Sequence, residues 1–248
     1  MRYEAMFKFH ILRSSKDIFG HIILIAVPVV LIIFFNYIFN GIIFQNSIGL
    51  DRTHYIHVLI VGFAVSFQIF GASLSFENLG NDFFSPIRNR LKATPVQLRN
   101  IILSVLFSGT IISFIQTMAI FGAAAIILKI TLPRIWLATL LMLLSVIVHQ
   151  LIGTVVLFLS RSVRTANVVT TFYGIVAPMT IGLYFPLPEH AFVDIMRRYL
   201  TPIALANTAT FGALRYDNSD VFVGMIPLII LAVGLFALLQ PLMNRVTK

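Results

Sequence analysis

The sequence has no cysteine among its 248 residues, which excludes a disulfide framework and any metal site built on thiolates. Charge is also scarce, because 11% of the residues are charged while 58% are hydrophobic. A soluble domain cannot hide that much apolar surface. The sequence also lacks a Gly-x-x-x-x-Gly-Lys-Ser/Thr loop and a His-Glu-x-x-His pair. These absences exclude a phosphate loop for ATP and a zinc-protease helix.

Charged residues are missing altogether from six long windows, each longer than the roughly 20 residues needed to cross about 30 Å of hydrocarbon. Backbone amides in lipid must be satisfied within their own segment, so the windows predict helices despite their many Ile, Val and Phe residues. We therefore expect an all-α integral membrane protein. Its six transmembrane helices are predicted at residues 20–40, 54–76, 100–128, 135–160, 165–187 and 221–243.

The distribution of Lys and Arg predicts the orientation of these spans. An even number of spans places both termini on one side, and twelve of the 18 Lys and Arg residues then fall on that side. Excess Lys and Arg marks the cytoplasmic side. We therefore expect both termini in the cytoplasm, and the net charge of +9 needs no nucleic-acid partner.

Residues 1–18 show apolar side chains at helical spacing, with Lys8 and Glu4 elsewhere on the helix. This pattern predicts an interfacial helix on the inner leaflet. Phe9 and Leu12 interrupt the pattern, so a frayed extension of the first span is the alternative.

Two polar stretches between spans also carry helix signals. In residues 77–97, Ser85 and Pro86 resemble a helix start, and Ile87 to Ala93 would form two turns; a plain basic loop is the alternative. Residues 188–218 predict two short external helices that dip into the outer leaflet, with Thr201-Pro202 as the turn between them.

The windows offer few residues for chemistry. No ionisable side chain of the kind that marks ion or proton pathways lies deep in them except His149, and a lone histidine there can equally be a hydrogen-bonding partner for a neighbouring helix. A Ser73–His149 dyad would imply an intramembrane hydrolase. A small residue at a helix interface explains Ser73 better.

The six spans, the interfacial helix, the basic loop and the external helix pair together resemble ABC-2-type exporter permeases over the whole chain. The most local marker is Arg90-Leu91-Lys92-Ala93-Thr94-Pro95-Val96, which looks like the Leu-Leu-x-x-Thr-Pro-Val ending that follows the coupling helix in such permeases. Glu77 fits the acidic residue common at the exit of the second span. Asn81 to Pro86 departs from the alternating Glu/Arg run that relatives usually show there.

The resemblance implies a permease that pairs with a second, identical or homologous permease and docks on two copies of an ABC ATPase subunit. ATP and Mg would bind in that subunit, and this chain would bind no cofactor and no metal. It also implies a plasma (inner) membrane of bacterial type. The residues expected to couple to the ATPase are Glu77, Phe83, Phe84, Ile87, Arg88, Arg90 and Leu91.

In such permeases the first, second and fifth spans line the path, and bulky rings with scattered amides there suit an amphipathic or hydrophobic substrate such as a drug, an antimicrobial peptide or a lipid-like molecule. The residues expected along the path are Phe34, Phe35, Asn36, Phe67, Gln68, Phe70, Thr171 and Tyr173. The same rings can equally be packing residues. Other interpretations are polysaccharide or glycolipid export, a passive channel or scaffold, and the hydrolase.

Overall fold

The computed structural model describes residues 2–46, 52–93, 96–185, 187–188 and 190–247. Within these residues all regular secondary structure is helical, in eleven helices and without strands. The helices are α1 Arg2–Ser14, α2 Ile18–Asn46, α3 Arg52–Ser66, α4 Gln68–Phe83, α5 Ile87–Lys92, α6 Leu98–Leu128, α7 Ile135–Ser160, α8 Val163–Thr180, α9 Ala191–Tyr199, α10 Pro202–Leu214 and α11 Asn218–Thr247.

Five described helical segments are long and apolar enough to cross a membrane, so the prediction of an all-α membrane protein is confirmed at this level. They are Ile18–Ile38, Tyr55–Phe83, Leu98–Leu128, Ile135–Ser160 and Asn218–Thr247. The predicted fifth span is not among them, because Arg164, Asn167 and several threonines make α8, a helix of 18 residues, less apolar than the other five segments. The helix α8 ends at Thr180 rather than at the predicted residue 187. Just after this end, Gly182 turns the chain with a φ of +75°.

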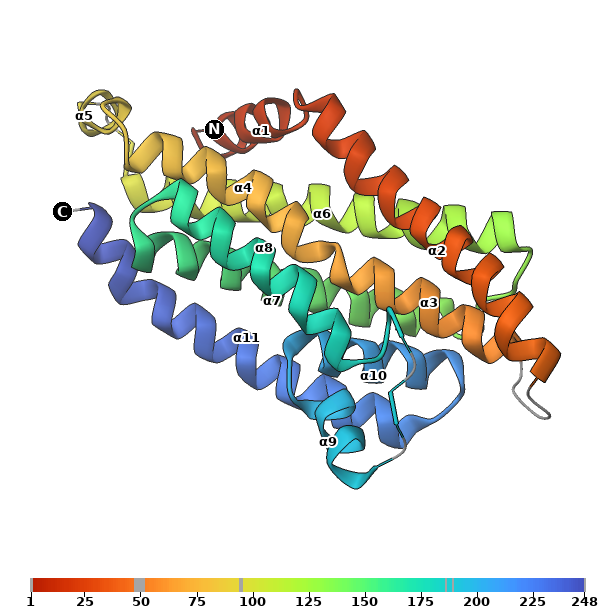
Figure 1. Cartoon of the computed structure of the whole chain (residues 1–248). Coiled ribbons are helices and arrows are strands. Elements are labelled where there is room, and N and C mark those ends of the chain that lie inside the picture. The colour runs from red at the N-terminus through yellow and green to blue at the C-terminus, as the bar shows by residue number, and fades with distance from the viewer. Residues whose placement is uncertain (1, 47–51, 94–95, 186, 189, 248) are drawn as a thin grey trace.

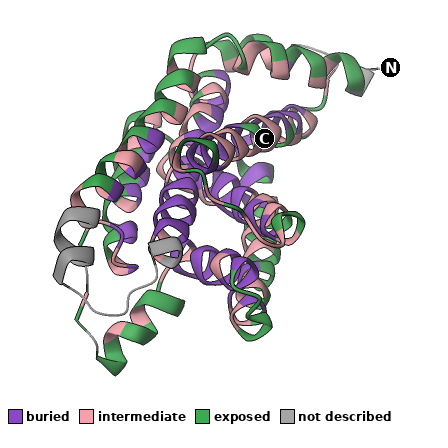
Figure 2. Cartoon of the chain, turned by 90° about the vertical axis from the view of Figure 1, so that its right-hand side faces the viewer, coloured by how far each residue is buried: buried purple, intermediate pink, exposed green. Residues whose placement is uncertain are grey.

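The long helices form one bundle with both chain termini at the same end (Figure 1). In the most apolar 18-residue stretch of the segment Tyr55–Phe83, which joins α3 and α4, 72% of the residues are buried, and in that of α7 67% are buried. The corresponding share is 17% in both α2 and α11. Thus α3, α4 and α7 form the centre, where Figure 2 shows the buried residues gathered, while α2 and α11 lie at the outside.

Small residues allow the central helices to approach closely. An added Cβ at Gly71 would lie 2.7 Å from the Ser113 hydroxyl, and one at Gly153 would lie 2.9 Å from the ring of Phe76. Such contacts drive helix association in membranes, where burial of apolar surface gives no advantage over lipid. Contact with lipid therefore explains why the outer helices expose apolar side chains.

The region between α8 and α11 contains two short helices, as the sequence predicts. Thr201 caps α10 by accepting a hydrogen bond from the Ala204 amide at 3.0 Å, and Pro202 stands in its first turn. Most residues of α10 are buried, and the helix packs on α11, α7 and α3. It is therefore a helix of the bundle interior rather than one that dips into lipid, whereas α9 exposes its apolar face.

Candidate functional site

Helices α1 and α5 and the C-terminal part of α4 lie at the end of the bundle that holds both termini, called here the α5 end (Figure 1). Arg13, in the last turn of α1, donates from Nη1 to both carboxylate oxygens of Asp82, at 2.9 and 2.7 Å. The Asp82 side chain is only 7% exposed. A carboxylate buried to this extent needs such a charge partner. The pair therefore fixes α1 to the last turn of α4, just before α5.

His10 lies beside this ion pair and is 5% exposed. Burial lowers the pKa of His10 below its ordinary value of 6.5, the negative charge of Asp82 opposes this shift, and the positive charge of Arg13 adds to it. The imidazole is thus neutral at pH 7. Neutral His10 and the Arg13–Asp82 pair together form a compact contact between α1 and α4.

The short helix α5 begins where the sequence predicts it. The Ser85 hydroxyl accepts a hydrogen bond from the Ile87 amide at 3.1 Å and donates one to the Asn81 carbonyl. Pro86 precedes the first helical residue. The helix ends at Lys92, while Thr94 and Pro95 of the motif lie outside the described residues. Ser85 therefore links the end of α4 directly to the start of α5.

The residues expected to couple to a partner divide into an inner and an outer set. Phe83 is 1% exposed, and the partly buried Phe84 meets the Phe158 ring at 6.3 Å. Arg88 donates to the Val246 carbonyl at 2.8 Å, so it caps the C-terminal end of α11. Phe83 is therefore buried, while Phe84 and Arg88 contact α7 and α11 and remain partly exposed.

The outer face of α5 is basic. Ile87 is 45% exposed, and Asn89, Arg90 and Lys92 are exposed as well. Leu91 is partly buried against the core. The surface presented by this helix is therefore one apolar side chain, one amide and two cations, which matches a partner with an acidic, partly apolar cleft.

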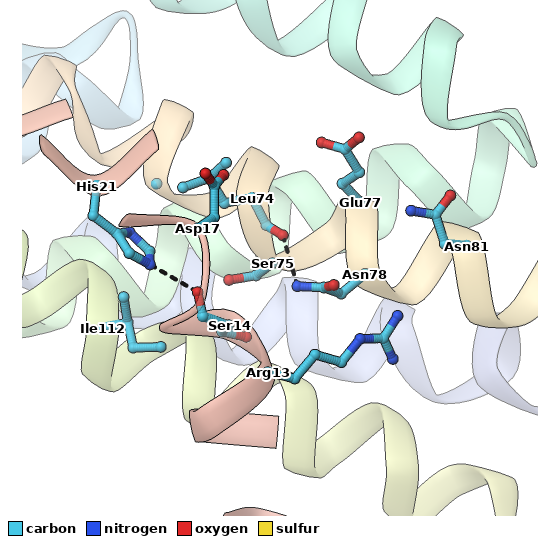
Figure 3. Close-up of a pocket in the computed structure, with 11 residues that line it drawn as sticks. Arg13, Ser14, Asp17, His21, Leu74, Ser75, Glu77, Asn78, Asn81 and Ile112 are labelled. Carbon is cyan, nitrogen blue, oxygen red and sulfur yellow. Dashed lines mark hydrogen bonds between the residues drawn. The ribbon is translucent and has the colours of Figure 1, made fainter. Parts of the chain in front are cut away.

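A cavity of about 220 Å³ lies next to Arg13, between the turn that joins α1 to α2 and one face of α4. Figure 3 shows its polar lining, including Asp17 from the turn, His21 from the start of α2, and Glu77, Asn78 and Asn81 from α4. It brings carboxylates and amides close to the Arg13 guanidinium. The cavity can thus hold a polar group at the edge of the apolar bundle.

His21 fixes the shape of this cavity. Its Nε2 donates to the Ser14 carbonyl at 2.7 Å, and its Nδ1 accepts from the Gln116 amide at 2.7 Å. Because a carbonyl oxygen can only accept, the proton lies on Nε2. Asp17 accepts from the Gly20 amide at 3.1 Å and begins α2. The start of α2 is therefore held to α6 through Gln116, while Arg13 holds α1 to α4.

A second polar cluster lies in the middle of the bundle, where α3 meets α4. Ser145 donates to the Gln68 carboxamide oxygen at 2.5 Å. His149 Nδ1 lies 2.9 Å from the Ser145 carbonyl, and its Nε2 lies 3.4 Å from the Tyr173 hydroxyl. These bonds satisfy the buried groups across α4, α7 and α8.

This cluster bears on the hydrolase interpretation. Ser73 donates to the Phe70 carbonyl of its own helix at 2.7 Å. His149 is 0% exposed and is held by Ser145 and Tyr173. The structure does not bring these two side chains together as a nucleophile and a base.

The residues expected along the substrate path do not form one lining in a single chain. Phe34 and Thr171 are exposed, Phe35, Phe67, Phe70 and Tyr173 are partly buried, and Gln68 and Asn36 are buried. Phe35 packs on Phe63 at 5.6 Å, and Phe67 on Phe70 at 5.4 Å. Several of these rings therefore serve packing within the bundle, while Phe34 and Thr171 face outward.

Sequence reasoning did not identify Arg13, Asp82, His10 or the cavity at His21. One signal was available for Asp82, because Phe76, Leu79 and Phe83 mark the buried face of α4 and a carboxylate beside this face in the last turn requires a cation. The identity of that cation depended on how α1 docks.

No protein-family model matches the sequence, and a search of curated proteins finds none that matches.

Proposed function

We propose that this chain is the permease subunit of an ATP-driven exporter of the ABC-2 type. The observation that carries the proposal is α5, a short helix with an exposed basic face placed at the end of the buried central segment Tyr55–Phe83. Only three residues separate α4 from α5, and Ser85 bonds to both helices. A displacement of α5 would therefore be transmitted through α4 to the middle of the bundle.

The proposed topology has six spans, with α8 as the fifth. Eighteen helical residues extend about 27 Å at 1.5 Å per residue, which nearly matches the roughly 30 Å hydrocarbon core. The helix packs against α4 and α7 in the bundle. With six spans, the basic α5 end and both termini face the cytoplasm of a bacterial plasma (inner) membrane.

The proposed complex has two permease protomers and two ATPase subunits. The ATPase subunits bind ATP and Mg, and each accepts one α5 through its exposed Ile87, Arg90 and Lys92. The bonds of Arg88 to α11 and of Arg13 to α4 would carry the displacement of α5 into the transmembrane helices.

The proposed substrate is an amphipathic or hydrophobic molecule. The cavity at His21 offers Glu77, Asn78 and Asn81 at one edge of α4, while Phe67 and Phe70 follow deeper on the same segment. A molecule with a polar head and an apolar body matches this order of side chains.

A pull-down of the full chain from native membranes tests the ATPase partnership. We expect a nucleotide-hydrolysing subunit to copurify with the wild type and to be lost with Arg90→Glu/Lys92→Glu, because the two reversed charges would face an acidic cleft. Arg164→Glu is the matched control, since Arg164 is also exposed but lies outside α5. Equal recovery of the ATPase with both variants would exclude α5 as its docking site.

A further inference from the structure

A second cavity lies at the end of the bundle opposite the termini, where α9, α10 and the start of α11 meet (Figure 1). Its volume is about 180 Å³. A water molecule occupies roughly 30 Å³ in the liquid, so the space accepts a small polar group. Its polar lining comes from Arg197, Arg198, Asn207, Thr208, Arg215 and Asp220.

Positive charge dominates this lining, with three arginines and one carboxylate. Arg197 pairs with Asp194 at 2.7 Å, but both side chains are about half exposed, so this contact is weak. Arg198 lies 3.4 Å from Asp220. Arg215 stacks on the Phe211 ring at 5.4 Å, and no salt bridge within the described part of the chain includes it. The cavity therefore has guanidinium N–H groups, those of Arg215, that are in no salt bridge of the described residues.

Buried polar groups line the cavity as well. Asn207 is 9% exposed, and its side-chain oxygen has no hydrogen-bond partner among the described residues. A carboxamide offers two N–H donors and an acceptor, and it can turn to present either side. Thr208 is 8% exposed. A buried carboxamide oxygen without a partner is costly. If the amide turns, an N–H group takes the place of this oxygen and can donate to a bound anion.

The neighbouring helix α9 places the cavity at the membrane surface. Phe192 is 67% exposed, Ile195 60% and Leu200 61%, while Arg197 and Arg198 stand in its last turn. A short helix with one apolar and one charged face lies flat at the boundary of headgroups and acyl chains. Its arginines are then at the level of lipid phosphates.

We propose that this cavity binds a phosphate oxyanion, either the phosphodiester of an anionic phospholipid or a free phosphate, through Arg198 and Arg215 with Asn207 at its base. The planar guanidinium fork matches phosphate oxygens. The site is separate from α5 and does not depend on an ATPase partner.

Native mass spectrometry of the purified full chain tests this site with dioctanoylphosphatidylglycerol as the probe and dioctanoylphosphatidylcholine as the neutral comparison. We expect phosphatidylglycerol to bind the wild type more tightly, and Arg198→Gln/Arg215→Gln to bind it at least tenfold more weakly. Lys129→Gln is the matched control, because it removes a charge from an exposed residue outside the cavity and should leave binding unchanged. Thermal unfolding without lipid shows whether each variant is folded.

Competition with inorganic phosphate distinguishes the two sources of the anion. Displacement of phosphatidylglycerol by millimolar phosphate would assign the site to a free anion, and persistence of the lipid would assign it to a headgroup. Arg197→Gln should have a smaller effect than Arg215→Gln, because Arg197 already pairs with Asp194. Equal binding of both lipids by the wild type, or full binding by a folded Arg198→Gln/Arg215→Gln variant, would overturn the proposal.

Discussion

The contact between Arg13 and Asp82 predicts an asymmetry between two single substitutions. Arg13→Leu leaves a carboxylate that is 7% exposed without its cation, and removal of one partner of a buried pair costs about 3 kcal/mol. Asp82→Asn leaves an amide oxygen that still accepts one bond from Arg13, whose side chain is 29% exposed and can turn to water. We expect this second change to cost about 1 kcal/mol.

Amide hydrogen exchange in α1 measures this difference, because the pair holds α1 on the bundle. The two estimates differ by about 2 kcal/mol, so α1 should exchange roughly thirtyfold faster in Arg13→Leu than in Asp82→Asn. Arg13→Leu/Asp82→Leu should recover most of the protection, because it leaves no buried charge. Exchange in α7 should not change. Equal exchange of α1 in the two single variants would refute the reasoning.

Two further substitutions probe packing and protonation. Gly224→Ala should destabilise the bundle by about 2 kcal/mol, because the added Cβ would clash with the Leu205 carbonyl oxygen of α10. Gly234→Ala should be neutral or slightly stabilising, because its added Cβ would meet no neighbouring atom within 4 Å. Similar thermal unfolding of the two variants would contradict this prediction. Since burial lowers the pKa of His10 below 6.5, the unfolded chain takes up the proton first as pH falls, so stability should decrease below about pH 6.5. His10→Gln should lose part of this decrease in unfolding measured at pH 7.5 and 5.5, and an unchanged pH dependence would show that His10 is not buried neutral.

The sequence predicts the long helices well, because charge-free windows allow no other structure in lipid. For α7 the predicted and observed bounds agree, at residues 135–160. The end of α8 was missed by seven residues, because Pro178 and the turn at Gly182 did not interrupt the apolar run. Charge and hydropathy do not register such a turn.

Contacts between helices explain the other differences between the predicted and the observed surroundings of the site residues. The resemblance implied that Phe83 couples to the ATPase, yet Phe83 continues the buried face of α4 after Phe76 and Leu79. Arg88 was predicted as a docking residue, but its side chain donates to the Val246 carbonyl at the end of α11. The Arg13–Asp82 pair joins residues 69 positions apart. No local pattern in the sequence reports such partners.

Crosslinking from α5 in native membranes tests the central claim most directly. Because the chain has no cysteine, Arg90→Cys provides a single attachment point for a photoreactive group. A crosslink to a nucleotide-hydrolysing subunit from this position, and none from Lys129→Cys at the other end, is the predicted result. Crosslinks from position 90 to lipid alone, or to proteins without a nucleotide site, would contradict the assignment of the chain as an ATP-driven permease.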